Sequence, residues 1–175
     1  MEDRTATYDA LKIENQLCFP LYACARRVTG QYTDILKPLN LTYTQYLVML
    51  VLWERDQVSV GELGRTLYLD SGTLTPLLHK LEKAGYVTRR RSSEDERIVR
   101  ITLTREGRAL REKAEGIPQR IGSCVRISRE EAQTLYTLLY RILDGIESPE
   151  GPEPEARGAC VQVPEREAST GRRDP

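Results

Sequence analysis

The feature that most constrains how this chain can fold is a change of hydrophobic period at Gly85. Before Gly85, three segments have the pattern of amphipathic or buried helices. Each segment opens with a helix N-cap signal, and these signals are Thr42 with Gln45, Ser59 with Glu62, and Asp70 or Ser71. Gly85 supplies the left-handed stop of the third helix. The sequence therefore predicts three consecutive helices, the last of which ends at Gly85.

After Gly85 the apolar residues alternate with polar ones, which indicates β-strands. The segments "YVTRRRS" and "RIVRITLT" both alternate, and the polar "SEDE" between them is typical of a hairpin loop. This alternation places Val99, Ile101 and Leu103 on one face of the second strand. Three helices followed by a hairpin is the order of a winged helix-turn-helix. We therefore expect a mainly α fold with a small β-hairpin wing, the winged helix covering about residues 43–104.

Further helices flank this winged helix on both sides. We expect them at about residues 8–37, 105–122 and 129–146. The first has natural break points at Gly30 or Pro38, and the last follows a capping box from Ser128 to Glu131. The apolar stripes of these helices need more cover than a small winged helix offers. We therefore expect segments 8–37 and 105–146 to form a homodimer, and an intramolecular bundle is the alternative.

The C-terminal segment 147–175 differs in composition from the rest of the chain. It holds five of the nine prolines and no aromatic residue. Such a segment buries too little apolar surface to offset its ordering entropy. The sequence thus predicts one folded domain at 8–146 and a disordered tail at 147–175.

Basic residues are concentrated in the winged helix, although the whole chain has 26 Lys and Arg against 26 Asp and Glu. Eleven basic residues and seven acidic ones lie in residues 61–111. A winged helix lays one short helix in the major groove of DNA and its hairpin tip on the backbone or minor groove. The residues that would contact DNA from that helix are Ser71, Thr73, Thr75, His79 and Lys80. In the wing, Arg97 would enter a narrow minor groove while Asp95 fixes the Arg97 side chain.

Other features of the sequence indicate the cellular compartment of the protein and whether it holds disulfides, a metal or a cofactor. The polar start "MEDRTATYDA" lacks the apolar core of a signal peptide, and no run reaches transmembrane length. We therefore expect a soluble cytoplasmic protein without a membrane partner. The four cysteines, at 18, 24, 124 and 160, form no C-x-x-C pair, and there is one histidine. We expect neither a disulfide framework nor a metal site, and no cofactor.

Cys18 lies in the apolar run "NQLCFPLYACARR", one helical turn before Tyr22. A buried thiol is usually a small hydrophobe, but a thiol that ionises is an oxidisable switch. Because a free cysteine has a pKa of about 8.5, a sensing thiol needs groups that stabilise its anion. No Lys or His lies near Cys18 in the sequence, so hydroxyl donors such as tyrosines would have to serve. Cys24 lies about 120° further around a helix and is expected to be structural.

Two segments of the chain resemble a known family. The run "LYLDSGTLTPLLHKLEKAGYVTRRRSSEDERIVRITLTREG" is similar to the winged helix of MarR-type regulators. The segments "LKIENQLCFPLYACARRVTGQY" and "LNLTYTQYLVMLVLWE" resemble the organic hydroperoxide resistance repressors within that family. The resemblance covers about residues 10–146. It implies a dimer that, when reduced, binds a palindromic operator in double-stranded DNA, and that leaves this operator when an organic hydroperoxide oxidises the protein.

The resemblance also implies roles for individual residues. Cys18 matches the reactive cysteine, and Tyr32 and Tyr43 match two tyrosines that reach the thiol from the partner subunit. Cys124 is favoured as the second cysteine that resolves the sulfenic acid across the dimer, and Cys160 in the tail is the rival resolver.

Two other functions remain open from the sequence. A thiol peroxidase would use Cys18 as its nucleophile, but the P-x-x-x-T-x-x-C frame of such enzymes is missing around Cys18. A MarR-type regulator that binds a small-molecule ligand would leave Cys18 as a buried core residue. We expect a repressor and not an enzyme.

Overall fold

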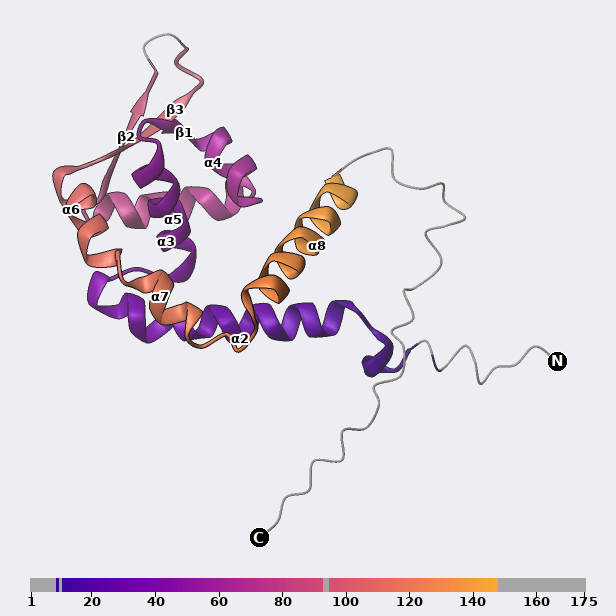
Figure 1. Cartoon of the computed structure of the whole chain (residues 1–175). Helices are drawn as coiled ribbons and strands as arrows, with labels where there is room; N and C mark the ends of the chain where they lie inside the picture. Colours follow the sequence, from indigo (N-terminus) through magenta and orange to yellow (C-terminus); the bar gives the residue numbers. More distant parts are fainter. Residues whose placement is uncertain (1–8, 10, 93–94, 148–175) are drawn as a thin grey trace. The chain divides into compact units, whose positions relative to one another are not determined.

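The computed structural model describes residues 9, 11–92 and 95–147 of the 175-residue chain (Figure 1). Two compact units are present. One comprises the described residues from 28 to 125, and the other comprises the described residues up to Arg27 together with those from Arg126 to Glu147. The described elements are η1 (Ile13–Asn15), α2 (Cys18–Leu36), η2 (Lys37–Leu39), α3 (Tyr43–Glu54), β1 (Val58–Ser59), α4 (Val60–Leu67), α5 (Ser71–Lys83), β2 (Val87–Arg91), β3 (Val99–Leu103), α6 (Arg105–Ala114), α7 (Ile117–Gly122) and α8 (Arg129–Glu147).

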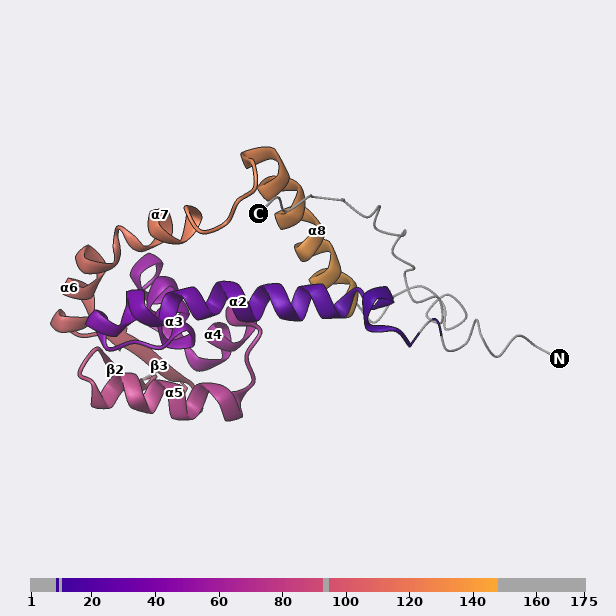
Figure 2. The same cartoon turned by 90° about the horizontal axis from the view of Figure 1, so that it is seen from below.

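The unit 28–125 is built around helices α3, α4 and α5, as the sequence predicts. The capping boxes of α3 and α4 are both formed, and Asp70 is the residue that caps α5. Helix α3 is the central helix because it is apolar on almost all sides, with Val48, Met49 and Leu52 almost wholly buried. Helix α5 lies along one edge of the unit in Figure 2.

A small antiparallel sheet completes this unit. The strand order is β1-β3-β2, and β2 pairs with β3 from Val87 opposite Leu103 to Arg91 opposite Val99. Ile101 and Leu103 are buried while Ile98 is exposed, so the predicted alternation is confirmed. Gly85 has a φ of 78°, which confirms the left-handed stop before the hairpin. The sequence analysis did not predict β1, whose two residues are too short for a periodic signal.

Two predicted helices have different boundaries in the structure. The first begins at Cys18 and not near residue 8, because Pro20 can occupy only the first turn of a helix that starts there. It also runs through Gly30 without a break and ends at Leu36. The expected helix at 105–122 is two helices, α6 and α7. Gly116 separates them, and Pro118 follows at the second position of α7, where a missing N–H costs little.

The second unit contains α8, which carries the predicted Ser128–Glu131 capping box. The Ser128 N–H donates to the Glu131 carboxylate at 2.7 Å, and the Glu131 N–H donates to Ser128 Oγ at 3.2 Å. Large apolar side chains of α8 are exposed in the single chain, and they are Leu135, Tyr136, Leu138, Leu139, Tyr140, Ile142 and Ile146. A run of apolar side chains open to water on one helix is typical of a protein interface. The predicted tail lies outside the described residues, apart from its first residue, Glu147, which ends α8.

Candidate functional site

Helix α5 presents the predicted DNA-contacting residues on one exposed side. Leu74, Leu77, Leu78 and Leu81 are buried, which fixes the orientation of the helix against the core. The side chains on the open side are Ser71, Thr73, Thr75, His79 and Lys80, and all five are exposed. The exposed N-terminus of α5 also carries the partial positive charge that attracts phosphate. The structure therefore brings these five residues together on one surface.

Local bonds hold part of this surface in place. Thr73 Oγ1 donates to the Asp70 carboxylate at 2.9 Å, and Thr75 Oγ1 donates to the Ser71 carbonyl at 2.8 Å. His79 lies 3.7 Å from a Glu82 oxygen, an ion pair only when the imidazole is protonated. The backbone and side-chain hydrogen bonds from Thr73 lower the pKa of Asp70, so this cap stays charged at neutral pH. The exposed Lys80 ammonium makes no hydrogen bond or ion pair with any described residue and is available to a phosphate.

The wing carries the second group of predicted contacts, and one detail of the prediction is wrong. Asp95 Oδ1 accepts the backbone N–H of Arg97 at 2.9 Å, and the Asp95 carbonyl accepts the N–H of Ile98 at 2.9 Å. Asp95 thus fixes the turn and not the Arg97 side chain, because an Asp carboxylate readily bonds the N–H two residues on. The Arg97 side chain is exposed and makes no ion pair with any described residue.

Asp56 ties the end of α3 to the base of the wing. Its Oδ1 accepts the N–H of Leu103 and that of Gln57, each at 2.9 Å, and its Oδ2 lies 2.6 Å from Arg108 Nη2. Burial raises the pKa of Asp56, but the hydrogen bonds from Leu103, Gln57 and Arg108 outweigh burial and hold the pKa below its usual value. Sequence reasoning missed this residue because its partners are 47 and 52 positions away.

The rings of Tyr32 and Tyr43, the two predicted thiol-facing tyrosines, lie against each other at a tilt of 52°. Their ring centroids are 4.6 Å apart, and the Tyr46 ring lies 5.9 Å from that of Tyr32. Burial raises the pKa of all three tyrosines, and the neighbouring tyrosine rings add to this for Tyr32 and Tyr46. The three phenols are therefore protonated near neutral pH and able to donate hydrogen bonds.

Three of the four cysteines lie in the described residues. Cys18 is the first residue of α2, and its side chain is exposed in the single chain. Cys24 is also exposed on α2, whereas the sequence analysis expected a structural role. Cys124 is exposed just after α7, and its Sγ donates to the Arg120 carbonyl at 3.4 Å. Cys160 lies outside the described residues.

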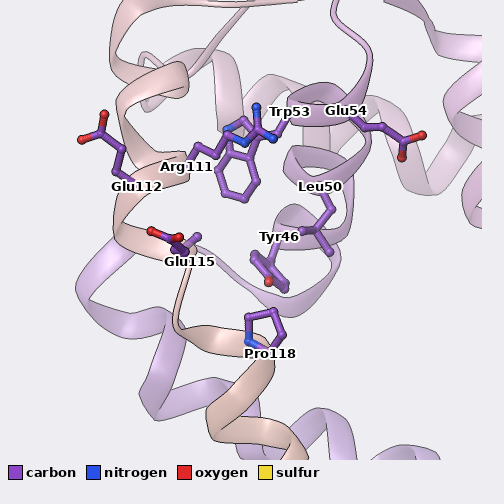
Figure 3. Close-up of a pocket in the computed structure, with 9 residues that line it drawn as sticks. Tyr46, Leu50, Trp53, Glu54, Arg111, Glu112, Glu115 and Pro118 are labelled. Carbon is purple, nitrogen blue, oxygen red and sulfur yellow. The ribbon is translucent and has the colours of Figure 1, made fainter.

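A pocket of about 500 Å³ lies between α3 and the segment α6–α7 (Figure 3). Its lining residues are Tyr46, Leu50, Trp53, Glu54, Arg111, Glu112, Ala114, Glu115 and Pro118. Trp53 Nε1 donates to the Gly107 carbonyl at 2.9 Å, which holds α3 against α6. Sequence reasoning missed the pocket because the two walls are more than fifty residues apart.

The described residues give two further findings. No described helix is long and apolar enough to cross a membrane. In that same part of the chain, His, Cys, Asp and Glu side chains nowhere gather in a group of three that could hold a metal ion.

Comparison with known proteins finds relatives that match most of the chain. The model of the transcriptional regulator SarA/Rot family matches residues 31–114. The organic hydroperoxide resistance transcriptional regulator of Bacillus subtilis is 50% identical over 137 residues, which is 78% of this chain and 93% of that protein. Similar solved structures include AbfR of Staphylococcus epidermidis.

AbfR has been solved in more than one oxidation state. Its reduced, DNA-bound structure has a TM-score of 0.68 and 35% identity, over 81% of this chain and 99% of that one. Its disulfide form has a TM-score of 0.56 and 36% identity, over 79% and 98%. The winged helix, the exposed face of α5 and the tyrosine cluster agree with these relatives. The chain therefore belongs to the organic hydroperoxide resistance regulators of the MarR family.

Proposed function

We propose that this chain is a homodimeric, redox-sensing transcriptional repressor that leaves its operator when an organic hydroperoxide oxidises Cys18. The observation that carries the proposal is the contact between the partly buried rings of Tyr32 and Tyr43 in a chain whose Cys18 is exposed. Partly buried phenols that stay protonated are suited to hold an anionic sulfur by hydrogen bonds. The relative from Bacillus subtilis is a regulator of organic hydroperoxide resistance, and AbfR is known in reduced, overoxidised and disulfide forms.

The length of helix α2 supports the proposal that the tyrosines act on the thiol of a partner subunit. Cys18 is the first residue of α2, and Tyr32 lies fourteen positions later in the same helix. At a rise of 1.5 Å per residue, the two are about 21 Å apart along the helix axis. A thiol and a tyrosine of one chain therefore stay apart while α2 is helical, and a second copy has to bring its Cys18 to the tyrosines.

The exposed apolar side chains support this dimer. Leu17, Phe19 and Tyr22 flank Cys18 and are open to water in the single chain, as is the apolar side of α8. Burying such side chains between two copies is favourable by about 25 cal/mol for each Å² of apolar surface. A twofold dimer places two α5 helices at sites one DNA turn apart, about 34 Å, which suits a palindromic operator.

The chemistry at Cys18 is a two-electron oxidation. The thiolate attacks the distal oxygen of the hydroperoxide, the O–O bond breaks, and the alkoxide leaves as an alcohol after taking a proton, so that Cys18 becomes a sulfenic acid. The N-terminal end of α2 carries partial positive charge and favours an anion at its first residue. Leu17 and Phe19 beside the thiol favour a peroxide with an apolar carbon group.

Cys124 is the proposed resolving cysteine. Its thiol would attack the sulfenic sulfur of the partner's Cys18 and release water, leaving one disulfide between subunits. The two α-carbons must come within about 7 Å for that bond. A helix movement that closes this distance would change the spacing of the two α5 helices and release DNA. Cys160 is the alternative resolver.

In this function Cys18 consumes one equivalent of hydroperoxide and then stays oxidised, so the protein acts as a sensor and not as an enzyme. The relatives found are transcriptional regulators, which supports this reading. A thiol peroxidase would instead consume many equivalents of hydroperoxide when given a thiol reductant. Because the target is operator DNA, we also propose that the protein works in the cytoplasm.

Gel-shift titration with the DNA upstream of the gene, before and after one equivalent of cumene hydroperoxide, tests this function. We expect the reduced wild type to bind, the treated protein to release DNA, and Cys18→Ser to stay bound. Non-reducing gels of the same samples should show a cross-linked dimer that Cys124→Ser abolishes and Cys160→Ser retains. Unchanged DNA binding by the oxidised wild type would contradict the proposal.

A further inference from the structure

Tyr68 is an exposed aromatic residue in the turn that joins α4 to α5, and the DNA contacts described so far do not use it. It directly follows Leu67, the last residue of α4, and lies three positions before Ser71, the first residue of α5. Tyr68 is 46% exposed. Its hydroxyl makes no hydrogen bond with a residue that the structure describes. The hydroxyl is therefore open to a partner beside the N-terminal end of α5.

The backbone of Tyr68 adopts a conformation that side chains other than glycine seldom adopt. Its φ is 54° and its ψ is 42°, in the left-handed region. Glycine, and sometimes asparagine, is the usual residue at such a helix end, because a β-carbon crowds the following carbonyl oxygen there. Among the described residues, the other two non-glycine residues with positive φ are Asn40 and Gln57, and neither is aromatic. A large aromatic residue held in this conformation points to a function of its side chain.

The turn holds Tyr68 in a fixed position relative to α5. The N–H groups of Tyr68 and Leu69 both donate to the Gly64 carbonyl, that of Leu69 at 2.9 Å. A β-carbon at Gly64 would lie 2.8 Å from the Leu69 carbonyl oxygen, so α4 and the turn are in close backbone contact. On the other side, Asp70 caps α5 by accepting the Thr73 N–H at 2.9 Å. Because the backbone is bonded on both sides of Tyr68, the ring leaves the turn from a defined place beside the start of α5.

We propose that the Tyr68 hydroxyl donates a hydrogen bond to a phosphate oxygen of the operator, beside the major groove that α5 enters. The inference rests on the proposed binding of operator DNA through α5. A recognition helix puts its N-terminal residues at the base edges, so the turn before this helix lies close to the sugar–phosphate backbone. Tyrosine hydroxyls are among the side-chain groups that bind phosphates, and such contacts fix orientation and register without reading sequence. Tyr68 thus positions α5 in the groove.

A neutral hydroxyl on a phosphate differs measurably from a charged contact. Lys and Arg displace counterions from DNA, whereas a tyrosine displaces none. Tyr68→Phe should therefore weaken operator binding about fivefold, as expected for one neutral hydrogen bond, and leave the dependence on salt unchanged. DNA of unrelated sequence should lose affinity by the same factor, because every site has phosphates. Fluorescence anisotropy of the reduced full-length protein, measured at several salt concentrations, gives both quantities.

Tyr68→Gly separates the phosphate contact from the structure of the turn. Glycine adopts the left-handed conformation without steric cost, so this variant should unfold at no lower urea concentration than the wild type and still bind DNA weakly. Gln57→Gly is the matched control, because Gln57 is also exposed, has a φ of 61° and lies outside the α4–α5 turn. We expect Gln57→Gly to bind DNA like the wild type.

The possible results separate this inference from the proposed function. Tyr68→Phe that binds DNA as tightly as the wild type overturns the inference alone, as does a salt slope lowered by about one. Tyr68→Gly that loses stability together with DNA affinity also overturns it, since Tyr68 would then be a structural residue of the turn. Wild-type protein that failed to bind the operator would contradict the proposed function as well.

Discussion

Replacing Gly107 with alanine tests how α6 is seated against the strand that forms the wing. A β-carbon at position 107 would lie 2.0 Å from the Tyr86 carbonyl oxygen and 3.2 Å from Leu103 Cδ2. The added carbon would clash with the backbone of Tyr86 and not with a flexible side chain, so either α6 or the start of β2 has to move. That Tyr86 oxygen accepts the Thr104 N–H at 3.0 Å and Thr104 Oγ1 at 3.1 Å.

The cost of this movement in free energy of unfolding can be worked out from the hydrogen bonds that it would break. The two bonds to Tyr86 and the bond from Trp53 Nε1 to the Gly107 carbonyl are each worth about 1 kcal/mol, roughly 3 kcal/mol together. Overpacking adds about 1–3 kcal/mol, and the better helix propensity of alanine returns about 1 kcal/mol. We therefore expect Gly107→Ala to lower the free energy of unfolding by roughly 3–5 kcal/mol.

Urea unfolding at matched protein concentration, followed by circular dichroism and by Trp53 fluorescence, measures this loss. Gly30→Ala is the matched control, because nothing lies within 4 Å of the added carbon inside α2, and we expect a change of no more than about 1 kcal/mol. A Gly107→Ala protein as stable as the wild type would refute the described seating of α6.

Three further predictions concern other parts of the molecule. Tyr43→Phe removes one hydrogen-bond donor beside Tyr32, so Cys18 should be oxidised about tenfold more slowly, as measured by intact mass, while the reduced protein still binds DNA. An unchanged oxidation rate would show that the Tyr43 hydroxyl does not activate the thiol. Arg97→Ala should weaken binding to all DNA sequences and lower the salt slope by about one, and an unchanged slope would remove Arg97 from the interface. Because the folded pKa of Asp56 is lowered, its stabilisation is complete above the unfolded pKa near 3.8 and is lost as the pH falls through the folded pKa. Asp56→Asn should therefore be less stable than the wild type by about 1 kcal/mol at pH 7, and a gap that failed to narrow in strong acid would contradict this.

The winged helix could be predicted because its signals are local. A capping box such as Thr42 with Gln45 spans one turn, and the left-handed Gly85 marks the point where the period changes. The boundaries that were wrong depended on single prolines and glycines. Pro20 sets the start of α2, and Gly116 separates α6 from α7.

The candidate site was less predictable because its parts come from distant segments. The family resemblance implied that Tyr32 and Tyr43 both reach the thiol, but their contact with each other was not predicted, since ten residues and a helix break separate them. The role of Asp56 at the wing base and the pocket beside Trp53 depend on how α3 meets β3 and α6. The packing of α3 against β3 and α6 cannot be predicted from a local pattern in one sequence.

The central claim is that the oxidation state of Cys18 determines whether the protein is on DNA. The most direct measurement follows both quantities in the same samples while cumene hydroperoxide is added in small steps. Intact mass gives the fraction of Cys18 still present as thiol, and fluorescence anisotropy gives the fraction of operator bound. The account predicts that the two fractions fall together and that both recover with a thiol reductant if the product is a disulfide. Release of DNA while Cys18 remains a thiol, or full oxidation with DNA still bound, would contradict it.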